Sequence, residues 1–167
     1  IHAAAGGVGQ AAVQLAEIAG AEIYATAGSD EKRSFLRTLG VPHVYDSRSL
    51  AFQEQVLADT HGDGVNVILN CLADDFIDAS FAVLAANGRF FEIGKRGIRT
   101  PAEVAAERPD VSYHIVDLSA TAVDDPDTLS RLLHRVMDDM RAGHTRPLPL
   151  EVFEHTAVAD AFRHMAN

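Results

Sequence analysis

A glycine-rich turn near the start of the chain most strongly limits what this sequence can fold into. Gly6 and Gly9 occupy the second and third glycine positions of the pattern G-x-G-x-x-G, and Ala4 takes the first. The pattern lies between a short apolar stretch and an expected helix. There, glycines let the backbone approach a pyrophosphate, which the free N–H groups of the helix N-terminus hold. Gly6, Gly7, Val8 and Gly9 are therefore candidate cofactor-binding residues, the alternative being a tight turn without a ligand.

Strand and helix patterns alternate along the chain, which predicts a parallel sheet with helices on both faces. Strands are expected over residues 1–3, 22–27, 43–46, 65–70, 89–93 and 112–117. Helices are expected over residues 10–19, 30–39, 50–59, 75–84, 100–107, 127–142 and 157–165. Ser29 or Asp30 caps the second helix and Ser49 the third. The apolar run at residues 65–70 is typical of a strand buried on both faces. The predicted fold class is α/β: a Rossmann-type, doubly wound, mostly parallel sheet of six strands.

Composition and charge exclude several classes of function. The formal net charge of −10 argues against a general nucleic-acid surface. No apolar run approaches the roughly 20 residues of a membrane span. The single cysteine, Cys71, excludes an internal disulfide and a cysteine-based metal cluster. The eight histidines have no metal-ligand spacing and are expected mostly at the surface. We therefore expect no nucleic-acid partner, no membrane span, no metal and a cytoplasmic location.

The end of the second expected strand bears on the choice between NADH and NADPH. In NAD enzymes an acidic residue about 20 positions past the glycines binds the ribose 2′-hydroxyl. Here that place falls near Ala27, and Ser29, Lys32 and Arg33 follow it. A hydroxyl group and a nearby cation can bind a 2′-phosphate. The sequence thus favours NADPH, with Ser29, Lys32 and, after the third strand, Arg48 as candidate phosphate ligands; Arg33 is equally well explained as an exposed helix residue.

The first expected strand is unusually short. It has three residues, whereas strands normally run to about 5–6, and the chain has no initiator Met. We therefore interpret the chain as a piece of a longer protein. Residues 1–144 are expected to form an NADP-binding domain. Residues 145–167 are expected to follow it as a loop or edge segment, because of Pro147 and Pro149, with a final short helix.

Five stretches, in order along the chain, resemble the enoyl reductase domains of polyketide synthases and animal-type fatty acid synthases. These are zinc-free medium-chain dehydrogenase/reductases. The stretches are HAAAGGVGQAAVQLA, ATAGSDEKRSFL, YDSRSLAFQEQV, GVNVILNCLA and GRFFEIGKRGI. The resemblance implies that NADPH gives a hydride to the β-carbon of an enoyl thioester on an acyl carrier protein. It also implies contacts with other domains of the same synthase and a homodimer through the last strand.

The resemblance implies two catalytic residues. Lys95 lies in the GK pair after the fifth expected strand, and Asp117 in the D-L pair at the end of the sixth. Both follow strand carboxyl ends, where ligands bind in this fold. Lys95 could donate a proton or mainly orient the substrate, and Asp117 could hold its ammonium group. The alternatives are a solvated lysine and a helix cap.

The same resemblance implies a pocket for the nicotinamide ring. The segment after the fourth expected strand, which includes Asn70 and Leu72, lines that pocket in the family. Ile93 and Gly94 are expected to offer backbone contacts to the ring. Cys71 stands where the family has Ser, and we interpret it as a packing residue because its side chain is small.

Two other interpretations stay open. One is a stand-alone NADPH quinone oxidoreductase of the same superfamily, and the other is a non-catalytic NADPH-binding domain. The YDSRSLAFQEQV and EIGKRGI stretches favour the synthase type. The resemblance implies that residues 145–167 begin a return segment towards a substrate domain that is missing here. Residues 1–167 alone are therefore expected to bind the cofactor with little catalysis.

Overall fold

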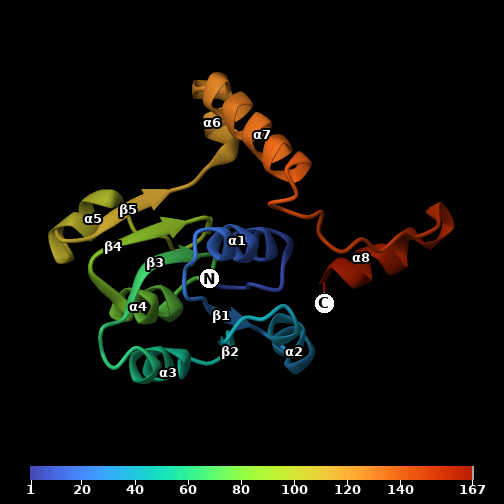
Figure 1. Ribbon diagram of the computed structural model, residues 1–167. Coiled ribbons are helices and arrows are strands. Elements are labelled where there is room, and N and C mark those ends of the chain that lie inside the picture. Colours follow the sequence, from blue (N-terminus) through green and yellow to red (C-terminus); the bar gives the residue numbers. More distant parts are fainter. Residues whose placement is uncertain (167) are drawn as a thin grey trace.

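The computed structural model describes residues 1–166 and has alternating strands and helices (Figure 1). The strands are β1 (Tyr24–Ala27), β2 (His43–Asp46), β3 (Val65–Asn70), β4 (Leu84–Glu92) and β5 (Ser112–Ile115). The helices are α1 (Gly7–Ile18), α2 (Asp30–Thr38), α3 (Phe52–Asp59), α4 (Asp75–Ala82), α5 (Pro101–Glu107), α6 (Leu118–Asp124), α7 (Pro126–Arg141) and α8 (Val158–Ala166). A 3-10 turn, η1 (His155–Ala157), precedes α8. The α/β class and the parallel strands agree with the sequence-based expectation.

The strands form two parallel sheets, in the orders β1-β2 and β3-β4-β5. The predicted count of six is wrong, because the described residues form five strands and residues 2–5 form a turn. Residues 1–4 nevertheless lie between the sheets. Thr26 N donates to Ile1 O at 3.0 Å, and His2 N donates to Leu69 O at 3.1 Å. The order in space is thus β2-β1, residues 1–4, then β3-β4-β5, as in a doubly wound fold.

Several expected boundaries move. The third helix begins at Phe52, not at residue 50, and its N-cap is Ala51 instead of the expected Ser49. The Ser49 hydroxyl accepts a hydrogen bond from Ala51 N, before the helix starts. Ser29, not Asp30, caps α2. Helix α6 was not expected: the predicted strand over residues 112–117 ends at Ile115, and α6 begins at Leu118. A capping side chain thus marks the start of α2 and of α6, whereas α3 begins without one.

The hydrophobic core consists of two clusters. One is built around Phe90 of β4 and Phe52 of α3, and the other around Leu36 of α2 and Val13 of α1. Both belong to the first 104 residues. Helices α1 and α4 lie on opposite sides of β3, and α6, α7 and α8 extend away from the strands (Figure 1). Among residues 118–165 no side chain is buried. The core therefore supports only the part of the chain that carries the strands.

The strand β3 is less buried than its apolar sequence suggests. Ile68 and Asn70 are buried, but Asn66 and Val67 are exposed, so the expectation of burial on both faces is wrong. The amino end of β3 borders a cavity of about 1020 Å³, which also reaches Tyr24 and Tyr45. No described helix is long and apolar enough to cross a bilayer.

Candidate functional site

The glycine turn is held close against the start of the sheet. A Cβ on Gly9 would lie 2.4 Å from the Ala4 Cα atom, so only glycine lets α1 pack this closely. Gly6 is the N-cap of α1, and no acidic side chain lies in the first turn. Ala3 has a φ of 47°, in the left-handed region that residues other than glycine rarely adopt. The result is a helix N-terminus open to an anionic group.

A pocket of about 240 Å³ opens at this turn. It is lined by His2, Ala3, Gly6, Gly7, Val8, Gly9, Leu69, Cys71 and Ile93. The pocket thus joins the glycine turn to the carboxyl ends of β3 and β4. All four glycine-turn candidates and Ile93 line it, whereas Asn70, Leu72 and Gly94 do not.

The candidate phosphate ligands surround the end of β1. The Ser29 hydroxyl accepts from Lys32 N at 3.3 Å as the N-cap of α2. The Arg48 Nε atom lies 3.1 Å from the position that a Cβ on Gly28 would occupy. Ser29 and Arg48 therefore flank the same short turn. A phosphate there would be met by a hydroxyl group and a guanidinium group.

Arg33 has a structural role instead. Its Nη1 atom donates to Ala27 O at 3.0 Å, and its guanidinium also pairs with Asp30 and with Asp46. These contacts hold the start of α2 against the ends of β1 and β2. Neither sequence-based alternative for Arg33, phosphate ligand or freely exposed residue, describes this arrangement.

A buried polar pair that the sequence analysis missed lies at the ends of β3 and β4. Asn70 and Glu92 are opposite each other in the sheet register, and both are 0% exposed. The Asn70 Nδ2 atom donates to Glu92 Oε2 at 2.7 Å. Glu92 Oε1 accepts from Gly94 N at 2.6 Å. The strand pattern of RFFEI gave no sign that its glutamate is buried.

Asn70 also fixes the chain that follows β3. Its Nδ2 atom donates to Leu72 O at 3.0 Å, and its Oδ1 atom accepts from Leu72 N at 3.1 Å. Between them, the Cys71 side chain is half-buried. Burial, and next the charge of Glu92, raise the pKa of the Cys71 thiol. A raised pKa keeps the thiol protonated, which agrees with a packing residue.

Lys95 and Asp117 meet at the carboxyl end of the larger sheet. The Lys95 Nζ atom lies 2.6 Å from Asp117 Oδ2, and the two side chains are 64% and 39% exposed. Asp117 also caps α6, because its Oδ1 atom accepts from Ser119 N and Ala120 N. The hydrogen bond from Lys95, followed by these backbone donors, lowers the pKa of Asp117. The carboxylate is thus both a partner of Lys95 and a helix cap.

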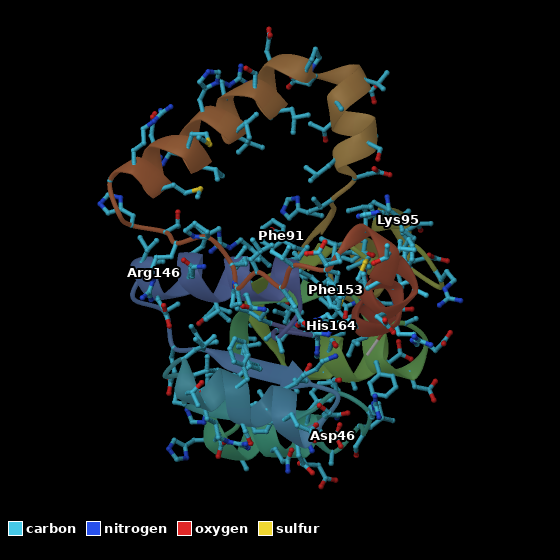
Figure 2. The ribbon with its side chains drawn as sticks, turned by 90° about the vertical axis from the view of Figure 1, so that its right-hand side faces the viewer. Asp46, Phe91, Lys95, Arg146, Phe153 and His164 are labelled. Atoms are coloured by element: carbon cyan, nitrogen blue, oxygen red, sulfur yellow. The ribbon has the colours of Figure 1, made fainter. Side chains whose placement is uncertain are left out.

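The two ends of the candidate site lie far apart. In Figure 2, Lys95 lies well above Asp46, which ends β2 of the β1–β2 sheet. The figure also shows Arg146 beside α1, where Arg146 N donates to Gln14 Oε1 at 2.7 Å. An elongated ligand would be needed to reach from the Asp46 end to Lys95.

His2 departs from the expectation of surface histidines. The Ser80 hydroxyl donates to Phe76 O at 2.6 Å, so its oxygen can accept from Nε2–H of His2 at 2.9 Å. The Nδ1 atom then accepts from the Thr26 hydroxyl at 3.0 Å. Burial lowers the pKa of His2 to about 3, so the ring is neutral at pH 7.

Comparison with protein families adds the classification. The family of zinc-binding dehydrogenases matches residues 7–137. The chain belongs to this family. Within residues 1–166, however, no three His, Cys, Asp or Glu side chains gather as metal ligands.

Relatives with solved structures place the chain more narrowly. It is 47% identical to the CurK enoyl reductase, covering 99% of this chain and 49% of that one, with a TM-score of 0.91. It is 41% identical to the nucleotide-binding subdomain of the enoyl reductase domain of PpsC from Mycobacterium tuberculosis, covering 89% and 84%, with a TM-score of 0.80. Within its family, the chain is thus a nucleotide-binding subdomain of the polyketide synthase enoyl reductase type.

The proteins that carry such domains are much longer. The chain is 43% identical to the phthioceranic/hydroxyphthioceranic acid synthase of Mycobacterium tuberculosis. The match covers 100% of this chain and 8% of that protein. The chain therefore spans less than a tenth of this curated relative and about half of the CurK enoyl reductase.

Proposed function

We propose that this chain is the NADPH-binding part of an enoyl reductase domain that reduces α,β-unsaturated thioesters on an acyl carrier protein. The observation that carries the proposal is the Lys95–Asp117 pair at 2.6 Å, at the carboxyl end of a sheet whose glycine turn opens into a pocket. Ligands bind at this end of open α/β sheets. The identity to polyketide synthase enoyl reductases supports the same chemistry.

The residues present fit a dinucleotide. The turn at Gly6–Gly9 would take the pyrophosphate at the N-terminus of α1. Ser29, Lys32 and Arg48 would take a 2′-phosphate at the end of β1, where no acidic residue stands in the place that NAD enzymes use. Ile93 and Gly94 would offer backbone contacts to the nicotinamide end, and the segment after β3, which includes Leu72, would line its pocket.

The bound cofactor would supply the hydride for the substrate β-carbon. Lys95 then has one of two tasks: its ammonium gives a proton to the α-carbon, or it holds the developing enolate oxygen and orients the thioester. Asp117 keeps the ammonium charged and directed in either case. One hydride and one proton together saturate the double bond.

The wider assembly is part of the proposal. The relatives are large synthases, so other domains of one polypeptide are the natural neighbours. We place residues 1–144 in the cofactor-binding domain and residues 145–167 in a return segment towards a substrate-binding half. A homodimer through β5 and a cytoplasmic location complete the proposal.

The test uses a complete enoyl reductase domain that contains this chain, with a crotonyl thioester and cofactor absorbance as the signal. NADPH should be oxidised in preference to NADH. Lys95→Met should lower turnover by roughly 100-fold, as loss of a general acid does, with NADPH affinity little changed. Arg141→Met, an exposed arginine on α7, is the control and should match the wild type.

The result also separates the alternatives. Oxidation of NADPH by a quinone but not by the thioester would identify a quinone oxidoreductase. NADPH binding without turnover of either substrate would identify a non-catalytic domain. Unchanged turnover in Lys95→Met would remove this lysine from the chemistry.

A further inference from the structure

The buried Asn70–Glu92 pair has no role in the chemistry described so far. A glutamate is almost never fully buried unless its charge is paired and hydrogen-bonded. Here each carboxylate oxygen has its own donor: Gly94 N for Oε1 and Asn70 Nδ2 for Oε2. Glu92 is therefore an acceptor on both sides, as an ionised carboxylate is.

The hydrogen bonds of the pair lead to two loops. Glu92 holds the backbone that follows β4, and Asn70 holds the backbone that follows β3 through both polar groups of Leu72. A Cβ on Gly94 would lie 2.6 Å from Glu92 Oε1, so the loop passes directly over the carboxylate. In addition, Ile93 N donates to Asn70 O at 2.9 Å. The pair thus sets the position of one loop relative to the other.

These two loops carry the nicotinamide-end groups of the proposed function. Leu72 belongs to one loop, and Ile93, Gly94 and Lys95 follow one another in the other. We infer that Glu92 is a positioning residue for enoyl reduction: through Gly94 and Asn70 it holds both loops so that the ring contacts and the Lys95 ammonium keep a fixed relative position. This inference rests on the proposed function.

A substitution by glutamine separates charge from volume at this place. The amide of glutamine has one acceptor and one donor group. In one orientation the glutamine oxygen accepts from Gly94 N, but its NH₂ group then faces the NH₂ group of Asn70. In the other orientation the oxygen accepts from Asn70 Nδ2, and the NH₂ group then faces the N–H group of Gly94. Asn70 cannot turn over to compensate, because both ends of its amide are held by Leu72. Glu92→Gln therefore loses one of the two links in either orientation.

The test uses the complete enoyl reductase domain with NADPH and a crotonyl thioester. Glu92→Gln should lower kcat about tenfold or more, because small displacements of reacting groups are costly. The NADPH:NADH preference should stay within about twofold, since Ser29 and Arg48 lie at the distant sheet. The fluorescence of bound NADPH should change, because its nicotinamide end is held differently.

Two further variants give the control and the rescue. Tyr45→Phe removes the hydroxyl group that donates to Asp59 Oδ2 at 2.6 Å, in the β1–β2 sheet and not at either loop, and should leave kcat within about twofold. Asn70→Asp combined with Glu92→Gln puts a donor on residue 92 opposite an acceptor on residue 70. This double variant should recover part of kcat, although its contact to Leu72 O is lost.

The outcomes separate two failures. If the wild-type domain reduces no thioester, the proposed function fails, and the inference fails with it. If the wild type is active and folded Glu92→Gln has the kcat of Tyr45→Phe, only the positioning role of Glu92 is overturned. Should Glu92→Gln not fold, Gly94→Ala displaces the same carboxylate, and wild-type kcat in that variant would overturn the role equally.

Discussion

The first 115 residues and residues 118–165 both contain amphipathic helices, yet they use their apolar side chains differently. In the first region, Phe90, Leu36 and Val13 are buried between strands and helices. In the second, Leu132, Leu133 and Val136 on α7 are at least half exposed. An amphipathic pattern therefore specifies which side of a helix is apolar, but not whether a sheet covers that side. The following substitutions test this difference.

The largest effect is expected in the core of the first region. Phe90 is 0% exposed, and its ring stacks on Phe81 with centroids 4.3 Å apart. Phe90→Ala should lower the free energy of unfolding by about 3–5 kcal/mol, because it removes buried contacts and leaves a cavity. Urea denaturation followed by circular dichroism measures the change. A loss below about 1 kcal/mol would mean that this region is no better packed than α7.

The second-largest loss of stability is expected at the glycine turn, where α1 packs closely on the backbone of Ala4. Gly9→Ala should cost about 1–3 kcal/mol, since the new Cβ would overlap the backbone of Ala4. Gly7→Ala is the matched control two residues earlier. Its Cβ would lie 3.8 Å from Leu148, an ordinary contact, so it should cost almost nothing. Equal denaturation midpoints for the two variants would contradict the close packing of α1.

A smaller effect should appear on acidification. The pKa of His2 is about 3 in the folded protein and about 6.5 when unfolded, so the unfolded state binds the extra proton between these values. The contribution of neutral His2 to the free energy of unfolding is therefore fully present above pH 6.5 and is lost as pH falls towards 3. Between pH 6.5 and 5 the wild type should lose about 1.5 kcal/mol more than His2→Gln. Parallel stability curves would show that His2 is not buried.

The smallest effect is expected on α7. Leu133 is 61% exposed, and Leu133→Ala should change the free energy of unfolding by less than about 0.5 kcal/mol. The same urea titration serves as the measurement, with Phe90→Ala as the reference. A cost of about 2 kcal/mol or more would show that this face of α7 is covered in solution.

Much of the fold could be predicted from local patterns. Periodicity, capping residues and the glycines that follow several helices located α1 to α5, α7 and α8 within a few residues. Helix α6 was missed because LSATAVD is short and has no clear apolar stripe. The missing sixth strand has a different cause: residues 1–4 make hydrogen bonds on both sides but are too short for a strand.

The candidate site was predictable in part. The glycine turn follows from its residues, and the resemblance supplied Lys95 and Asp117, which the structure brings into contact. Glu92 could not be found this way, because a glutamate ending a strand has the same local pattern whether it is exposed or buried. Its burial depends on Asn70, 22 residues earlier, through the sheet register. Long-range pairings of this kind leave no mark in a short window of sequence.

The position of residues 1–4 has a mechanical consequence. The phosphate ligands proposed around Ser29 follow the β1–β2 sheet, and Lys95 follows the other sheet, so the distance between them depends on how these four residues connect the sheets. Thr26 and Leu69 hold that connection from either side. A molecule bound along the whole crevice would tie the two sheets together a second time, and amide protons at the connection would then exchange with solvent more slowly.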